Sequence, residues 1–116
     1  MLENIREKIE DRIIDLINSS SGGRLVIFKP EKSDMDLVVE KKGDYKRSPV
    51  SLKIYDKDEL SQKEDSAVDD NLYLLFLHFD MVKQDIEDDV WIKDKTSKFL
   101  INKNDIGKFF VNKFGK

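Results

Sequence analysis

The sequence of 116 residues contains no cysteine, one histidine, one tryptophan and two prolines. The absence of cysteine excludes disulfides and thiolate metal sites, so we expect a protein of the reducing cytoplasm. Long hydrophobic runs are also absent. The longest, Leu72 to Leu77, is far shorter than the roughly 20 residues that cross a bilayer. The first residues combine acids with a helical pattern, which is not typical of a secretory signal. We therefore expect no membrane association.

The chain also lacks the excess of positive charge that is typical of nucleic-acid-binding modules. Lysine and arginine total 21 against 24 acids, and the net charge is −3, so a nucleic-acid partner is possible but not favoured. The charge is unevenly distributed: residues 56–70 hold seven acids and two lysines, whereas the chain from Lys93 onward holds seven lysines and two acids. These segments are either solvated faces or complementary patches for a protein partner or a homodimer.

Hydrophobic and charged residues each make up 39% of the chain, which is typical of a soluble globular domain with a charged surface. We expect one domain spanning residues 1–116. Residues 2–18 predict a helix, because apolar residues recur there at spacings of three and four. The serines and glycines of 19–23 are expected to end it.

Short apolar runs between polar connections predict strands. Residues 24–29 contain the continuous apolar run 25–28, and residues 72–79 are apolar at nearly every position. We therefore expect both strands to be buried on both faces, with 72–79 in the centre of the sheet. An acidic connection over 80–89 leads to a strand at 90–92, which is expected to form a hairpin with its predecessor. A further short strand is expected at 99–101.

Two segments remain, one polar and one at the C-terminus. The acidic segment 57–71 has no clear period. We expect one helical turn at 58–63 within a lid, a disordered segment or a surface loop that proteases can reach. Phenylalanines near the C-terminus recur at helical spacing, which predicts a last helix capped by Asn104 or Asp105. The fold class is therefore α+β: a mixed or antiparallel sheet of four to six strands with an N-terminal helix and a short C-terminal helix. The core is expected to include Leu25, Ile27, Leu37, Leu52, Leu74 and Phe76.

The stretch from Ser33 to Lys57 predicts two strands joined by a polar connection at Gly43–Asp44. Because side chains alternate along a strand, Asp36 is expected on the face opposite Met35, Leu37 and Val39. In the second strand, which follows Pro49, the same rule groups Lys53 with Ser51 and Tyr55, opposite Val50, Leu52 and Ile54. Antiparallel pairing would bring Asp36 and Lys53 to one face of the sheet.

An acid, a short connection and then acid-x-Lys on the next strand is the motif of the PD-(D/E)xK, or restriction-endonuclease-like, superfamily. Asp36 followed by Ser51-Leu52-Lys53 resembles it, with Ser51 at the position of the second acid. The resemblance implies that Asp36 and Lys53 are catalytic, that carboxylates hold magnesium, and that the lysine positions or activates the attacking water. Asp34 would join Asp36 as a metal ligand, since two residues along a strand span only about 6.6 Å. The run from Leu74 to Lys93 also resembles small uncharacterised bacterial proteins of this type.

Serine at position 51 removes one charge from the implied metal site, so we expect magnesium to be weakly bound or absent. The resemblance also implies an acid on the first helix, for which Glu10 and Glu7 are the candidates, although both also fit as solvent-facing charges. His78 fits a hydrogen-bonded structural residue, because a metal site built on it would have only carboxylates as partners.

Two functions therefore remain. The first is a nuclease-like domain, divalent-metal-dependent if active, whose catalytic site is degraded. The second is a non-enzymatic protein-interaction module or homo-oligomer subunit. The feature that distinguishes them is a second carboxylate beside Asp36 and Lys53.

Overall fold

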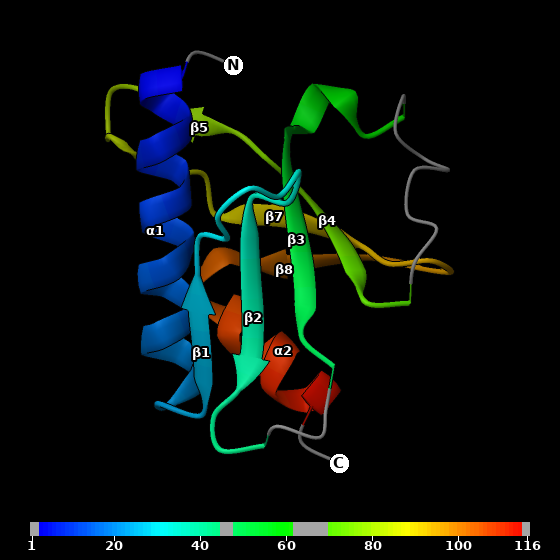
Figure 1. Ribbon diagram of the computed structural model, residues 1–116. Coiled ribbons are helices and arrows are strands. Elements are labelled where there is room, and N and C mark those ends of the chain that lie inside the picture. Colours follow the sequence, from blue (N-terminus) through cyan, green and yellow to red (C-terminus); the bar gives the residue numbers. More distant parts are fainter. Residues whose placement is uncertain (1–2, 45–47, 62–69, 115–116) are drawn as a thin grey trace.

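The computed structural model describes residues 3–44, 48–61 and 70–114 (Figure 1). Two α-helices and eight strands form within these ranges, together with two short 3₁₀ turns. In chain order they are α1 (Glu3–Ser21), β1 (Leu25–Phe28), β2 (Leu37–Lys41), β3 (Val50–Asp56), η1 (Lys57–Glu59), β4 (Leu72–Leu77), β5 (Phe79–Asp80), β6 (Asp85–Ile86), β7 (Asp89–Lys93), β8 (Lys98–Asn102), η2 (Lys103–Asp105) and α2 (Ile106–Phe114).

Six strands form one mixed sheet in the order β1-β2-β3-β4-β7-β8. Strands β3 and β4 run parallel, and the other neighbouring pairs in this sheet run antiparallel. This confirms the expected α+β class with an N-terminal helix and a short C-terminal helix. The acidic connection that was expected over 80–89 contains a small second sheet, because β5 and β6 pair with each other there.

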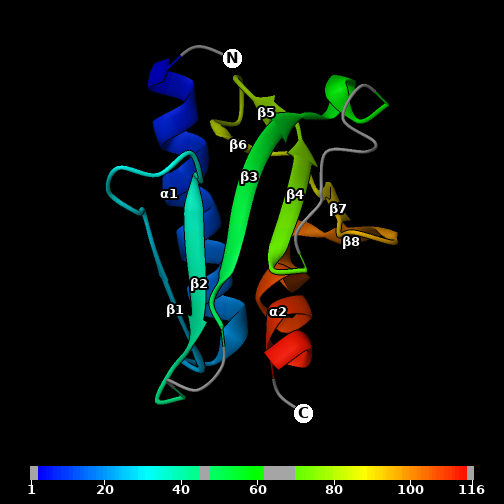
Figure 2. The ribbon, with the colours of Figure 1, turned by 45° about the vertical axis from the view of Figure 1, so that its right-hand side comes forward.

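Both helices pack on one face of the six-stranded sheet (Figure 2). Apolar residues on one side of α1 and α2, which recur with the helical period of 3.6, pack against every second residue of the strands. Together they form one core. The six residues predicted for the core are all buried, with at most 9% of their surface exposed. The apolar helix side chains buried in this core are Ile9, Ile13, Leu16, Ile17, Ile106, Phe110 and Phe114.

A smaller apolar cluster lies on the other face of the sheet, around β4. All six residues of β4 are buried, which confirms the prediction of a central strand covered on both sides. Tyr55 stacks on Phe76 there, with ring centroids 5.5 Å apart. Met35 joins this cluster instead of the face of Leu37 and Val39. Its predicted position is therefore wrong, because β2 begins only at Leu37 and the alternation does not extend back to residue 35.

Strand β1 is not buried on both faces, which corrects the sequence-based prediction. It lies at an edge of the sheet, and Val26 and Phe28 expose 41% and 39% of their surface. A short apolar run looks the same in an edge strand as in a central one. Only the order of the strands decides its burial.

Helix α1 continues to Ser21, three residues beyond its predicted end. The hydroxyls of Ser19 and Ser20 both donate to the carbonyl oxygen of Leu16, so these serines continue the helix instead of ending it. Gly22 and Gly23 then adopt φ angles of 64° and 77° and terminate it.

The predicted caps of the last helix are also corrected. Asn102 is the capping residue: its side-chain oxygen accepts from the Asn104 amide at 2.9 Å. A 3₁₀ turn, η2, then leads into α2. The one helical turn expected at 58–63 is the 3₁₀ turn η1, one residue earlier, and residues 62–69 of that segment lie outside the described ranges.

Candidate functional site

Strands β2 and β3 bring Asp36 and Lys53 to one pocket. The pairing of Leu37 with Leu52 places Asp36 opposite Lys53, and the Asp36 amide donates to the Leu52 carbonyl oxygen at 2.9 Å. The pocket has a volume of about 310 Å³. Besides these two residues it is lined by Arg6, Asp34, Ile54, Tyr55 and Glu59.

The carboxylate of Asp36 is engaged on both oxygens. Its Oδ1 accepts from Nη2 of Arg6, and its Oδ2 accepts from the backbone amide of Ile54 at 2.6 Å. Burial lowers the pKa of Arg6, but the hydrogen bond and charge of Asp36 and the charge of Glu10 raise it above its ordinary value. Arg6 is therefore a permanent cation in contact with the carboxylate that the motif assigns to a metal ion.

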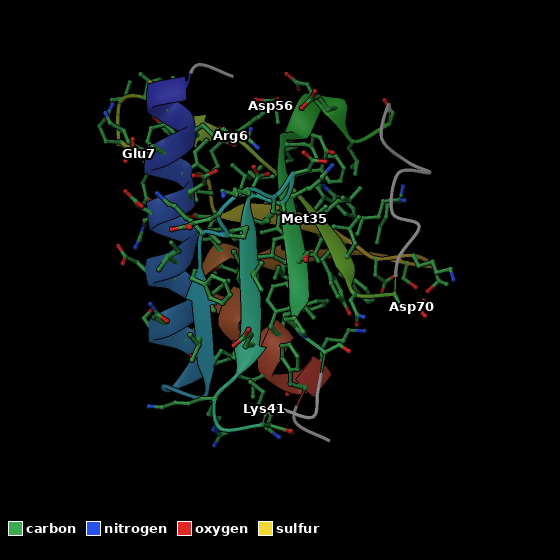
Figure 3. All side chains as sticks on the ribbon, in the orientation of Figure 1. Arg6, Glu7, Met35, Lys41, Asp56 and Asp70 are labelled. Carbon is green, nitrogen blue, oxygen red and sulfur yellow. The ribbon has the colours of Figure 1, made fainter. Side chains whose placement is uncertain are left out.

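The two candidate acids of the first helix lie in different surroundings. Glu10 is directed towards Arg6, with Oε2 3.6 Å from Nε of Arg6, and only 15% of its side chain is exposed. Burial, followed by the charge of Asp36, raises the pKa of Glu10. Glu7 is exposed, and Figure 3 shows its label and that of Arg6 on opposite sides of α1. Of the two acids, Glu10 is therefore the one that lies near Asp36.

Ser51 lies on the same face as Lys53, two residues away along β3. It pairs with Val38 of β2, and its backbone amide donates to the Asn71 carbonyl oxygen at 2.8 Å. Two further acids line the pocket, Asp34 and Glu59. Glu59 has a structural partner, because its Oε2 accepts from the Asp56 amide at 3.0 Å within the capping box of η1.

A second polar cluster lies where the parallel strands β3 and β4 end. Nε2 of His78, which follows β4, lies 3.2 Å from Oδ1 of Asp56 and 3.4 Å from Oδ1 of Asp58. Its other ring nitrogen, Nδ1, lies 3.7 Å from Oε2 of Glu87. We call these four residues the His78 cluster. Figure 3 shows Asp56 at the upper end of β3, the end at which Arg6 also lies.

Sequence reasoning did not find Asp56 and Asp58. It expected His78 to have only carboxylates as possible partners but could not place them. The missing information is the parallel register, which pairs Asp56 with Leu77 and so puts the residues after each strand side by side. An acid-x-acid pair that begins at the end of one strand, followed by a histidine directly after the next, is the only signal the sequence offers.

Two adjacent pockets of about 390 Å³ each share Arg24 and Val111, close to the ends of α1 and α2. Their lining includes Arg24, Lys41, Lys42 and Lys108, and no acid. We call these four residues the basic groove. Nζ of Lys108 lies 3.9 Å from Oδ1 of Asp105, whereas the other three side chains form no ion pair with any described residue. Lys41 lies at the end of the molecule opposite Asp56 (Figure 3).

Comparison with known proteins found no family model, no curated protein and no solved structure that matches the chain. No described helix is long and apolar enough to cross a membrane.

Proposed function

We propose that this chain is a nuclease-like domain whose catalytic site does not work. The observation that supports this most directly is the occupation of Asp36: one carboxylate oxygen accepts from Arg6 and the other from the Ile54 amide. The helix-strand-strand-strand order and the facing of Asp36 and Lys53 are consistent with the implied fold. According to this proposal, the fold around the site is kept, but Asp36 has a structural role: it holds α1 against the sheet.

The residues present do not fit the magnesium that the resemblance implies. Magnesium requires oxygen ligands in near-octahedral geometry, commonly one or two carboxylates with water and phosphate. Here the guanidinium of Arg6 contacts one carboxylate oxygen of Asp36, and its positive charge would repel a metal cation at that oxygen. Ser51 supplies no charge, and among the acids of the pocket only Asp34 forms no hydrogen bond or ion pair with a described residue.

A cleavage assay tests this proposal. Purified protein is incubated with single- and double-stranded DNA and RNA in magnesium or manganese. No cleavage is expected above that of an Asp36→Ala preparation. Cleavage by the unmodified protein that disappears in both Asp36→Ala and Lys53→Ala would overturn the proposal and make the domain an enzyme.

Restoring the site provides the complementary test. The double variant Arg6→Gln/Ser51→Glu frees Asp36 and supplies the missing acid, so calorimetry should detect magnesium binding that is weaker or absent in the unmodified protein. Ser51→Glu alone is the matched control, because it adds the acid while Arg6 stays on Asp36. If the double variant folds, as judged by circular dichroism, and binds no more magnesium than the control, the resemblance should be abandoned.

The second candidate function is a protein-interaction module, and the basic groove favours it. Three cations that have no ion-pair partner among the described residues line it, in a chain whose net charge is −3. An acidic partner surface, including that of a second copy, would complement them. Sedimentation at low and high salt tests the homodimer. We expect salt-sensitive self-association that weakens in Arg24→Glu/Lys42→Glu and persists in the control Lys83→Glu. A monomer at all concentrations would rule out the homodimer.

A further inference from the structure

We propose that the His78 cluster binds a zinc ion. Asp56, Asp58 and His78 each offer one ligand atom, and these three atoms lie within 4.8 Å of one another. The ligands come from the ends of two neighbouring parallel strands and from the 3₁₀ turn η1. This site is distinct from the Asp36–Lys53 pocket and does not depend on the proposed function.

The distances match the size of a zinc coordination sphere. Zinc binds imidazole nitrogen and carboxylate oxygen at roughly 2.0–2.2 Å, so two ligand atoms in tetrahedral geometry lie about 3.4 Å apart. Nε2 of His78 is 3.2 Å from Asp56 Oδ1 and 3.4 Å from Asp58 Oδ1. One nitrogen and two oxygens would leave a fourth position for water. The ion can enter freely, because the Asp58 side chain is 86% exposed.

A further carboxylate lies near the other ring nitrogen of His78, as is common for metal-binding histidines. Oε2 of Glu87 lies 3.7 Å from Nδ1, the nitrogen that faces away from the two aspartates. The Glu87 amide donates to the His78 carbonyl oxygen at 2.9 Å, which fixes this carboxylate beside the ring. Asp56 is oriented by its role as the cap of η1, where Oδ1 accepts from the Asp58 amide at 2.9 Å.

The charge of the cluster is not balanced by the described residues around it. Three carboxylates surround one imidazole, and no lysine or arginine of the described ranges forms an ion pair with any of them. Even a protonated His78 would leave two negative charges uncompensated. A bound divalent ion would compensate this excess while imidazole supplies a nitrogen ligand.

The donor set predicts the order of metal preference. A nitrogen ligand favours zinc over manganese and magnesium, since mixed nitrogen and oxygen sites bind manganese most weakly among these transition metals and magnesium prefers oxygen alone. The chain has no cysteine, and His78 is its only histidine. Any zinc site with an imidazole ligand must therefore include His78, so a variant of this one residue tests the proposal.

Proton NMR and calorimetry with zinc alone test the proposal. The imidazole resonances of His78 are the only ones in the spectrum, and zinc should shift or broaden them while calorimetry reports one site. His78→Gln should weaken zinc binding at least 100-fold, and Glu87→Gln about tenfold, as expected for loss of a ligand and of its supporting carboxylate. Asp70→Asn is the control for Glu87→Gln, because it removes one negative charge elsewhere on the surface. It should change the zinc affinity by less than twofold.

Three results would overturn the proposal. The first is an imidazole spectrum that zinc leaves unchanged. The second is zinc affinity equal in His78→Gln and the unmodified protein, which would indicate unspecific binding to surface acids. The third is magnesium binding as tight as zinc binding, which would exclude the imidazole as a ligand. Circular dichroism of His78→Gln confirms that the variant is folded. Asp58→Asn, at an exposed position, provides a second ligand variant if it is not.

Discussion

The backbone amide of Gly107 donates a hydrogen bond to the side-chain oxygen of Ser20 at 2.8 Å, and this contact joins the two helices. Ser20 in turn donates to the Leu16 carbonyl oxygen at 2.7 Å. A Cβ atom at position 107 would lie 2.2 Å from Ser20 Oγ and 2.6 Å from the Ile17 carbonyl oxygen. The close approach of α2 to α1 therefore requires glycine at this position.

Gly107→Ala is accordingly expected to destabilise the protein. Alanine favours a helix over glycine by about 1 kcal/mol, but overpacking against the α1 backbone typically costs about 1–3 kcal/mol and also displaces the Ser20 hydrogen bond. We expect a net loss in the free energy of unfolding, measured by urea titration. Asn112→Ala, at an exposed position of the same helix, is the control and should be nearly neutral. Equal or greater stability of Gly107→Ala would contradict this packing.

The apolar cluster around β4 leads to a second prediction. Phe76 and Leu74 expose 0% and 1% of their surface, so Phe76→Ala and Leu74→Ala should each cost about 2–5 kcal/mol through lost burial and the cavity left behind. Leu100 is 51% exposed, and Leu100→Ala should cost far less. A loss of less than about half a kcal/mol for Phe76→Ala in a urea titration would refute the central position of β4.

Asp85 supports a prediction about pH. Nε and Nη2 of Arg12 donate to its two oxygens at 2.7 and 3.3 Å, and Nζ of Lys103 adds a third bond at 3.0 Å. The hydrogen bond from Arg12, with smaller effects of Lys103 and the Ile86 amide, holds the pKa of Asp85 well below its ordinary value. Its ionised form therefore stabilises the fold above the ordinary value of about 4, and this contribution is lost as the pH falls towards the lowered pKa.

Asp85→Asn should consequently lower the free energy of unfolding at pH 7 by about 2 kcal/mol, as expected for hydrogen bonds to a charged group. The difference from the unmodified protein should narrow steadily as the pH is lowered below 4. Asp89→Asn, at an exposed position nearby, is the control and should show little effect at either pH. A difference that stays constant down to pH 2 would show that the charge of Asp85 is not the cause.

Much of this fold follows from local sequence patterns. Alternation alone places Leu37 and Val39 on the helix-facing side of the sheet, and β2 and β3 pair as expected. The Arg6–Glu10 pair could also be predicted from the sequence, because residues four apart lie on the same face of a helix. What the sequence does not encode locally is that Arg6 crosses to Asp36, since this depends on how α1 docks on the sheet.

Two other features have no local signal. The β5–β6 hairpin turns through Gln84 at a φ of 53°, without the glycine that usually marks such a turn. The His78 cluster depends on the parallel pairing of β3 with β4, which joins strands separated by the long polar segment after residue 56. No periodicity within either strand specifies that neighbour, so the meeting of His78 with Asp56 and Asp58 was not predicted.

Glu10 provides the last prediction, with the opposite sign to that for Asp85. Burial and the charge of Asp36 raise the pKa of Glu10, and the cations Lys29 and Arg6 offset this only in part. A raised pKa means that ionising this carboxyl costs more in the folded protein than in the unfolded chain. The cost is absent below the ordinary pKa of about 4.3 and fully present above the raised one.

Glu10→Gln, which mimics the neutral acid, should therefore raise the midpoint of urea unfolding at pH 7, and the gain should disappear at pH 4 and below. Glu7→Gln removes the same charge at an exposed position of the same helix and should leave the midpoint nearly unchanged. A lower midpoint for Glu10→Gln at pH 7 would show that the ion pairs with Arg6 and Lys29, at 3.6 and 3.8 Å, outweigh the burial of the charge. In that case the ionised form of Glu10 would stabilise the fold, and its pKa would be lowered instead of raised.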